Sequence, residues 1–410
     1  MPMFQPRILE HAIRRAVTTF PAIVVTGPRQ SGKTTLLRQL FGMSHHYVSL
    51  EDPNIRIRAK EDPVGFLNAH KPPVIFDEIQ YIPELLSYIK TRIDADRTPG
   101  QWLITGSQNF VLMRGVSESL AGRAAVLSLP PLSFAERIGT IETAHDPAGW
   151  IAALDPKASS KMTVSLTEQI FRGGYPELAL NFAVDRQLWC SSYIATYLER
   201  DIRNLTTIGD LSQFERFVRL CATRTGQVLN LTDFARDIGI SVPTAKRWLS
   251  ILETGMQIYL LYPYYRNIGK RLIKSPKLYF NDTALASYLL GLHNEETLLK
   301  SSHFGALFET MIIGDMVKRF LNFGQMPSLY YLRTRDGLEI DAVLDIGDRL
   351  HLFEIKATAT VVPKHAASII RLRADMDPPP ATTAILSLVT ENQHVTSGVE
   401  NYSWQYILAL

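Results

Sequence analysis

Residues 22–40 read AIVVTGPRQSGKTTLLRQL. An apolar, β-branched run passes into a glycine-containing loop, and the loop passes into a segment with helical spacing. The loop fits the pattern G-x-x-x-x-G-K-[ST] through Gly27, Gly32, Lys33 and Thr34, in the strand–loop–helix context that the pattern requires. Glycines let a backbone wrap an anion, so that N–H groups and the helix start point at phosphates. The stretch therefore predicts a nucleotide-binding α/β domain.

Within this loop, Lys33 is expected to bridge the β- and γ-phosphates of ATP, and the Thr34 hydroxyl is expected to reach Mg²⁺. The full set of predicted nucleotide-binding residues is Gly27, Pro28, Arg29, Gln30, Ser31, Gly32, Lys33, Thr34, Thr35 and Ser107.

A second apolar strand ends in two acidic residues. Residues 72–93 read PPVIFDEIQYIPELLSYIKTRI, with Val74–Phe76 as a buried strand and Asp77 and Glu78 at its end. Side chains alternate along a strand, so Asp77 is expected to take the metal side while Glu78 polarises the attacking water. The pair indicates hydrolysis rather than nucleotide storage; two solvated carboxylates are the alternative.

A later apolar strand and an arginine complete the first region. The strand QWLITGSQ, at 101–108, has a polar end at Thr105, Ser107 and Gln108, which is expected to lie beside the γ-phosphate. Arg123 precedes another apolar strand and is a candidate finger for the nucleotide of a neighbouring subunit. Arg114 competes for that role, and a plain surface arginine is equally compatible. A finger would imply a homo-oligomer formed through this domain.

The extra strand HHYVSLED at 45–52, inserted between loop and acidic strand, makes residues 1–140 resemble the AAA-type branch of the P-loop ATPases. The resemblance implies a parallel ASCE-type sheet that binds ATP and Mg²⁺. Residues 141–212 have turn chemistry followed by helical segments, so we predict a connection there. FRGGYPEL at 171–178, followed by YLERDIRNL, resembles prokaryotic ATPases fused to a C-terminal domain of unknown function. Arg172, Arg200 and Arg203 lie here, either in contact with nucleotide or partner or on a solvated face.

Residues 213–300 favour short helices and a hairpin. Ser241 is expected to cap a helix that turns Val242, Ala245, Leu249 and Leu252 inward. With the preceding helix this is helix-turn-helix spacing, and the following hairpin is typical of a wing. The projecting or wing residues that favour DNA contact are Thr244, Lys246, Arg247, Lys270, Arg271, Lys274 and Lys277. Packing against the ATPase domain or a second subunit is the alternative.

The region 301–410 begins with a helix that carries Glu309 toward its apolar face. An unpaired charge there would be costly, so a buried partner is expected. Three strands follow, at 329–333, 339–345 and 350–356. If the last two pair across the Gly347 turn, Asp341 and Glu354 fall at the same end of the hairpin. With Glu309 they make an all-oxygen set suited to Mg²⁺ or Mn²⁺, and Lys356 is placed to stabilise charge on a phosphate.

Glu, then Asp, then Glu-x-Lys in this order resembles the PD-(D/E)XK nuclease superfamily. The resemblance implies metal-dependent phosphodiester hydrolysis, with Asp341 and Glu354 as ligands, Lys356 as the catalytic lysine and Glu309 in support. Ile340 stands where the family pattern has proline. The alternative is a nuclease fold that has lost activity, in a protein that acts as an ATP-dependent switch or as a DNA-binding or partner-binding regulator.

The bulk composition adds little to these motifs. The 410 residues carry a formal charge of +3, which is compatible with DNA but does not indicate it. Two cysteines are too few for a disulfide framework or a cysteine metal cluster. No apolar run is long enough for a signal peptide or a membrane span, so we expect a cytoplasmic protein without a membrane partner.

Overall fold

The computed structural model describes residues 4–107, 115–116, 118–158, 164–197, 211–264, 275–334 and 337–410. The chain divides into two compact units, each treated by itself below. The first comprises Met1–Leu132 with the short segments Thr254–Met256 and Leu321–Gln325; the second comprises Ser133–Glu253, Gln257–Phe320 and Met326–Leu410. The candidate residues Gln108, Arg114, Arg200, Arg203, Lys270, Arg271 and Lys274 lie outside the described residues.

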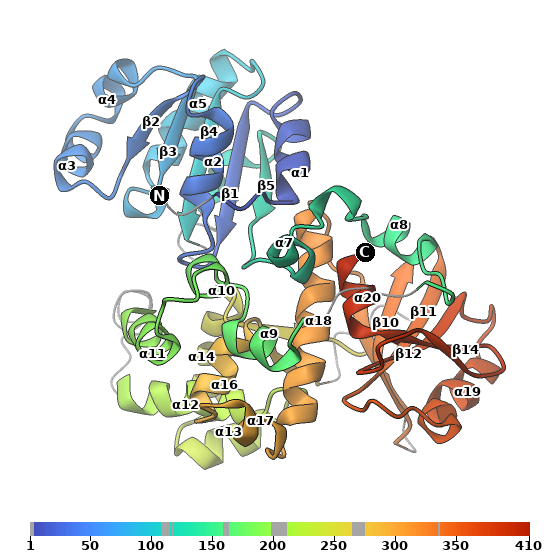
Figure 1. Cartoon of the computed structure of the whole chain (residues 1–410). Coiled ribbons are helices and arrows are strands. Elements are labelled where there is room, and N and C mark those ends of the chain that lie inside the picture. The colour runs from blue at the N-terminus through green and yellow to red at the C-terminus, as the bar shows by residue number, and fades with distance from the viewer. Residues whose placement is uncertain are drawn as a thin grey trace. The chain divides into compact units, whose positions relative to one another are not determined.

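The first unit is built on a parallel sheet of five strands in the order β2-β3-β4-β1-β5 (Figure 1). Its strands are β1 (Ala22–Gly27), β2 (His46–Ser49), β3 (Val74–Asp77), β4 (Trp102–Ser107) and β5 (Ala124–Ser128). Its helices are α1 (Leu9–Ala16), α2 (Lys33–Phe41), α3 (Pro53–Glu61), α4 (Pro63–Ala69), α5 (Leu85–Ala95) and the short η1 (Ile79–Tyr81). The predicted α/β class and parallel sheet are confirmed.

The sheet is buried on both faces, which explains why β1 reads as an unbroken apolar run. Val24 belongs to one core cluster, with Phe66 of α4 and Ile89 of α5. Ile23 belongs to the other, with Ile13 of α1. Because all strands run the same way, the carboxyl ends of β1, β3 and β4 lie at one edge of the sheet. That edge carries the phosphate loop, Asp77 and Ser107.

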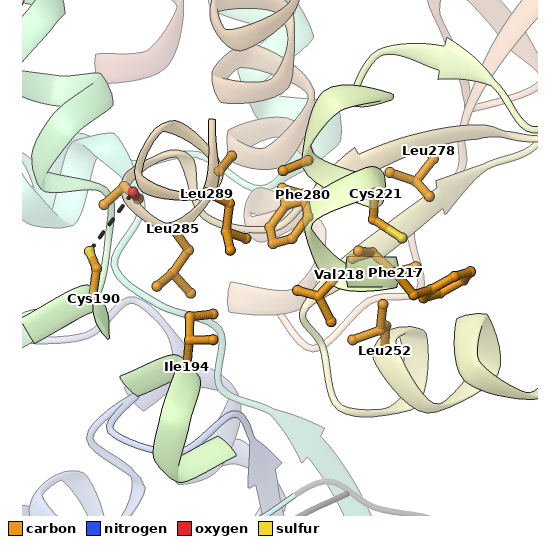
Figure 2. Close-up of a cluster of buried hydrophobic side chains, with 14 of the residues drawn as sticks. Cys190, Ile194, Phe217, Val218, Cys221, Leu252, Leu278, Phe280, Leu285 and Leu289 are labelled. Carbon is orange, nitrogen blue, oxygen red and sulfur yellow. Dashed lines mark hydrogen bonds between the residues drawn. The ribbon is translucent and has the colours of Figure 1, made fainter. Parts of the chain in front are cut away.

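The second unit begins with a helical region around a three-stranded sheet in the order β6-β8-β7. Its first helices are α7 (Phe134–Ile138), α8 (Pro147–Ala152), α9 (Leu166–Arg172), α10 (Pro176–Leu180) and α11 (Arg186–Tyr197). Then follow α12 (Leu211–Thr223), β6 (Gln227–Val228), α13 (Leu231–Ile238), α14 (Val242–Thr254), β7 (Ile258–Leu261), β8 (Lys277–Phe280), α16 (Thr283–Leu289) and α17 (Glu295–Leu299). Figure 2 shows Leu278 and Phe280 of β8 within the core of this region, which also buries both cysteine thiols.

The predicted helix pair corresponds to α13 and α14. Ser241 accepts a hydrogen bond from the Thr244 amide at 3.2 Å, as expected of a cap, and Ala245, Leu249 and Leu252 are buried. The prediction for Val242 was wrong, because its side chain is 40% exposed. It stands at the first helical position, where the apolar face has not yet turned inward.

The C-terminal part of the second unit contains a six-stranded mixed sheet in the order β13-β14-β12-β11-β10-β9. Its elements are α18 (Phe304–Asn322), β9 (Leu329–Arg333), β10 (Glu339–Ile346), β11 (Arg349–Lys356), α19 (Ala367–Ala374), β12 (Thr382–Ser387), β13 (Gln393–Thr396), β14 (Val399–Ser403) and α20 (Trp404–Ala409). Strands β10 and β11 form the expected hairpin, with Ala342 opposite Phe353, which brings Asp341 and Glu354 to the same end. In the described part of the chain, no helix combines the length and apolar character needed to cross a membrane.

Candidate nucleotide site and a C-terminal acidic cluster

The phosphate loop joins β1 to α2 through a backbone that needs its glycines. Gly27 has φ of 151°, and a Cβ there would collide with the carbonyl oxygen of Leu129. Gly32 has φ of 95° and directly precedes α2, which begins at Lys33. Gln30 also has a positive φ, of 60°, which is uncommon for a residue with a side chain. The loop is therefore a tight turn that delivers the helix start to the sheet edge.

Two buried basic side chains stabilise this loop by donating hydrogen bonds to its backbone carbonyls. Lys33 is buried, and its Nζ donates to the carbonyl oxygens of Gly27 at 3.1 Å and Pro28 at 2.8 Å. Arg7, just before α1, is also buried; its guanidinium donates to the carbonyl of Ser31 at 2.8 Å and to that of Pro130 at 2.6 Å. Arg7 thus links the loop to the residues that follow β5.

Asp77 is a hydrogen-bonding centre at the end of β3. Its buried carboxylate accepts from the hydroxyl of Thr34 at 2.7 Å, from that of Tyr47 at 2.8 Å and from that of Thr105. Burial, followed by the bond to Asp77, raises the pKa of Tyr47 to about 12. Strand β3 and the start of α2 therefore bring a carboxylate and a hydroxyl, both oxygen ligands suited to Mg²⁺, into direct contact.

Glu78 follows Asp77 in a left-handed conformation with φ of 59°. Its amide donates to the Thr105 hydroxyl at 3.1 Å, and its carboxylate accepts from the Gln80 side-chain amide. The side-chain oxygen of Gln80 accepts a hydrogen bond from the Ser107 amide at 3.2 Å. Positive φ in a residue with a side chain costs free energy and persists where neighbours enforce it, often at functional sites. Here Gln80 of η1 links Glu78 to Ser107 of β4 at the sheet edge.

The remaining loop residues differ in exposure. Pro28 and Ser31 are buried, Arg29 is half-buried, and Gln30 and Thr35 are exposed. The hydroxyl oxygens of Ser31 and Ser107 are buried without a hydrogen-bond partner among the described residues. Buried polar atoms are normally paired, so two such hydroxyls at one edge fit a site built for a polar ligand. The loop geometry, Asp77 and Thr34 therefore fit a nucleotide with its divalent metal.

The candidate finger Arg123 lies in an ion pair within its own unit. Its Nε and Nη2 atoms donate to the two carboxylate oxygens of Asp94, at 2.6 and 3.0 Å. This fork-to-fork geometry is the strongest form of an arginine–carboxylate pair. Action on another subunit's nucleotide would require this pair to open.

The second unit holds the C-terminal acidic cluster, which we define as Glu309, Glu339, Asp341 and Glu354. The expected buried partner of Glu309 is present: Lys277 Nζ lies 3.1 Å from its Oε1, and the Tyr279 hydroxyl donates to the same oxygen. Burial, and after it the Asp341 charge, raises the pKa of Glu309 to about 7. Both partners come from β8, which the sequence had indicated as part of a wing.

Asp341, Glu354 and Lys356 also meet, as the hairpin predicted. Lys356 Nζ lies 2.6 Å from Glu354 Oε1 and 3.6 Å from Asp341 Oδ2, and the Ile355 amide donates to that Asp341 oxygen at 2.8 Å. Burial, and after it Asp341, raises the pKa of Glu354 to about 8. Burial alone would lower the pKa of Lys356, but Asp341 and Glu354 outweigh it and the pKa is raised.

These carboxylates do not fit a divalent metal in the arrangement observed. Across the described residues, no group of three or more His, Cys, Asp or Glu side chains is disposed to hold a metal ion. Instead two lysine ammonium groups lie among Glu309, Asp341 and Glu354. The predicted three-carboxylate metal set is therefore not assembled here, because side-chain cations take up its oxygens.

Two predicted contact residues have internal roles. Lys277 is not a DNA-facing wing lysine, since its side chain is only 4% exposed. Arg172 donates to the backbone carbonyls of Leu178, Phe182 and Val184, so it closes the turn after α10. In contrast, Lys246 and Arg247 of α14 are exposed, as expected.

Three family models match successive parts of the chain. Residues 19–138 match the AAA domain, and residues 163–296 and 304–407 match two domains of unknown function, DUF8612 and DUF4143. The uncharacterized proteins Rv2008c of Mycobacterium tuberculosis and Mb2031c of Mycobacterium bovis are each 30% identical over 351 residues, spanning 85% of this chain and 73% of theirs. The chain belongs to the family of these two proteins. Its AAA domain supports ATP binding and an ATPase function.

Among solved structures, the Walker-type ATPase PABY2304 of Pyrococcus abyssi aligns with 69% of this chain and 94% of its own, at 15% identity and a TM-score of 0.43.

Sequence reasoning missed several residues of both sites. Arg7 and Tyr47 lie outside any motif, and their contacts depend on how distant segments meet. Lys277 and Tyr279 had an indirect signal, because Glu309 on an apolar helix face required a buried partner. The alternation of KLYF along β8 would place Lys277 and Tyr279 on one face, but nothing in the sequence pairs that face with α18.

Proposed function

We propose that this protein hydrolyses Mg²⁺-ATP at the loop of the first unit and uses the nucleotide cycle to control its second unit. The contact between Thr34 and Asp77, with Glu78 held directly beside it, is the observation that carries the proposal. A hydroxyl and a carboxylate in contact at the end of neighbouring elements are what a phosphate-bound Mg²⁺ needs, and a second carboxylate beyond them suits a base.

The chain's own residues then have distinct tasks. The loop amides and Lys33 hold the phosphates, and Lys33 exchanges its carbonyl partners for phosphate oxygens. Thr34 and Asp77 would hold Mg²⁺, which supplies charge neutralisation when bound. Glu78 orients and accepts a proton from the attacking water, and Ser107 lies beside it through Gln80. Gln80 therefore sets where the Glu78 carboxylate points before the water arrives.

Two substitutions test this assignment. Lys33→Ala is expected to abolish nucleotide binding, because the loop loses its buried cation. Glu78→Gln is expected to keep binding and lose turnover, because an amide cannot accept the proton. The exposed Glu84→Gln is the matched control. Wild-type turnover in Glu78→Gln, measured as phosphate release, would remove Glu78 from the role of base.

We propose further that residues 301–410 form a nuclease-like domain. The element order α18, β9, β10, β11, α19, β12 supports this proposal because it is compatible with a PD-(D/E)XK core, and Asp341, Glu354 and Lys356 lie on β10 and β11. The ion pairs of the buried Lys277 with Glu309 and Asp341, which the nuclease pattern does not include, favour the form of the proposal in which this fold has lost cleavage and serves as a switch partner. The test is incubation with linear, circular and single-stranded DNA and with RNA, under Mg²⁺ or Mn²⁺, with and without ATP. Cleavage by the wild type that disappears in Asp341→Ala and Lys356→Ala would show that the domain is an active nuclease.

We propose that region 213–300 is a winged-helix-like domain with α14 as its DNA-facing or partner-facing helix, and the pairing of β6 and β7 with β8 supports this. Exposed Lys246 and Arg247 support this. We expect Lys246→Ala/Arg247→Ala to bind DNA more weakly than wild type, and its binding to depend less steeply on salt concentration.

Assembly through the first unit, with Arg123 as the finger, is a separate proposal. It is tested by sedimentation with ATP and by the ATPase rates of mixtures of Arg123→Ala and Lys33→Ala chains.

A further inference from the structure

Strand β8 is buried on both faces, and its two faces have opposite chemistry. Leu278 and Phe280 point into the helical core, where Figure 2 shows them among residues such as Cys221 and Leu289. Side chains alternate along a strand, so Lys277 and Tyr279 point the other way. That other side faces the C-terminal acidic cluster.

The ammonium of Lys277 lies among three carboxylates of this cluster. Its Nζ is 3.1 Å from Glu309 Oε1, 2.5 Å from Glu339 Oε1 and 3.5 Å from Asp341 Oδ1. An ammonium has three N–H donors and no acceptor, so three surrounding carboxylate oxygens match its full donor capacity. The ring of Tyr331 lies 5.6 Å away, within range of a cation–π contact.

The other oxygens of the cluster are almost all engaged as well. Asp341 Oδ2 accepts from the Ile355 amide and faces Lys356, and Lys356 also holds Glu354 Oε1. Among the oxygens of this cluster, only Glu354 Oε2 is buried without a hydrogen-bond partner in the described part of the chain. A second cation placed among these oxygens would lie close to the Lys277 charge, in surroundings where screening by water is weak.

We propose that Lys277 is the built-in cation of the C-terminal acidic cluster: it ties β8 to the C-terminal sheet and keeps divalent cations out of the cluster. This proposal adds to the switch function proposed above and depends on that function only for its biological purpose. Exclusion of divalent cations itself requires neither ATP binding nor nucleic-acid cleavage. Because Lys277 is part of the chain, its ammonium stays beside the carboxylates at a high effective concentration, so it competes effectively with a free metal ion.

The test is direct binding of Mn²⁺ to the full-length chain without nucleotide, followed by electron paramagnetic resonance of free Mn²⁺. Wild type is expected to bind no Mn²⁺ in the cluster. Lys277→Ala is expected to gain one equivalent, and Lys277→Ala/Asp341→Asn is expected to lose it again. Lys300→Ala is the matched control, because Lys300 makes an exposed ion pair with Glu296 in the same unit. It should bind as wild type does.

Three results would overturn the proposal. One is a wild-type Mn²⁺ site that Asp341→Asn removes, and another is a folded Lys277→Ala that gains no site. If Lys277→Ala fails to fold, Mn²⁺ added during refolding should restore folding, and the Tm of the variant should rise with the Mn²⁺ concentration. The third contradicting result is that Mn²⁺ restores folding in neither Lys277→Ala nor Lys277→Gln. ATP hydrolysis, assayed separately through Lys33→Ala, reports on the proposed function and is unaffected by these outcomes.

Discussion

Replacing Arg7 by methionine should make the phosphate loop less ordered and weaken ATP binding. Methionine keeps most of the aliphatic stem but removes the guanidinium that bridges the carbonyls of Ser31 and Pro130. Hydrogen bonds to charged groups contribute ~1.5–3 kcal/mol each, so the two bonds sum to about 3–6 kcal/mol before relaxation. The carbonyl of Ser31 lies within the loop, so part of this loss falls directly on the conformation of the proposed phosphate-binding loop.

We expect ATP to bind Arg7→Met about 10- to 100-fold more weakly, which corresponds to about 1.4–2.8 kcal/mol. The remainder of the loss should lower the urea midpoint of the first unit. Affinity is measured by titration with a fluorescent ATP analogue. Arg14→Met is the matched control on α1, because Arg14 is exposed and forms an ion pair with Glu10 in the turn before it. Arg7→Lys, which retains the charge but not the fork, should fall between wild type and Arg7→Met.

If Arg7→Met binds ATP as tightly as wild type while its urea midpoint falls, Arg7 stabilises the fold of the first unit without ordering the loop. Equal weakening in Arg14→Met would also refute an ordering role for Arg7, since the effect would then come from net charge rather than from the hydrogen bonds of Arg7.

Other expectations concern the second unit. Phe280→Ala should destabilise it by about 3–5 kcal/mol, because the ring is 1% exposed and leaves a cavity, whereas Phe182→Ala, at 65% exposure, should change the urea midpoint little. Burial lowers the pKa of His351 below its ordinary 6.5. The unfolded chain therefore binds more protons between that lowered pKa and 6.5, so stability is full above pH 6.5 and falls as pH drops through the window. His351→Gln should flatten this part of a pH series of urea midpoints; an unchanged slope would show that another group titrates there.

Much of the geometry of the candidate nucleotide site was predictable from local sequence. The loop motif fixes a turn that needs Gly27 and Gly32, and the acidic pair follows a strand that can only be buried. Sheet order brings these together because parallel strands present their carboxyl ends at one edge. The hairpin of β10 and β11 was predictable for a similar reason: a glycine turn and alternation set the register, which pairs Ala342 with Phe353 and so brings Asp341 and Glu354 to the same end.

What the C-terminal acidic cluster contains depends on contacts between distant segments. The sequence showed that Glu309 needs a buried partner, because an unpaired charge on an apolar face is costly. It did not show that the partner is Lys277, a residue whose neighbours suggested a DNA-binding wing. Only tertiary structure turns that face of β8 toward α18 and β10, and thereby puts an ammonium where the motif alone predicts a metal. Local pattern determined which groups carry charge; long-range packing decided which charges neutralise one another.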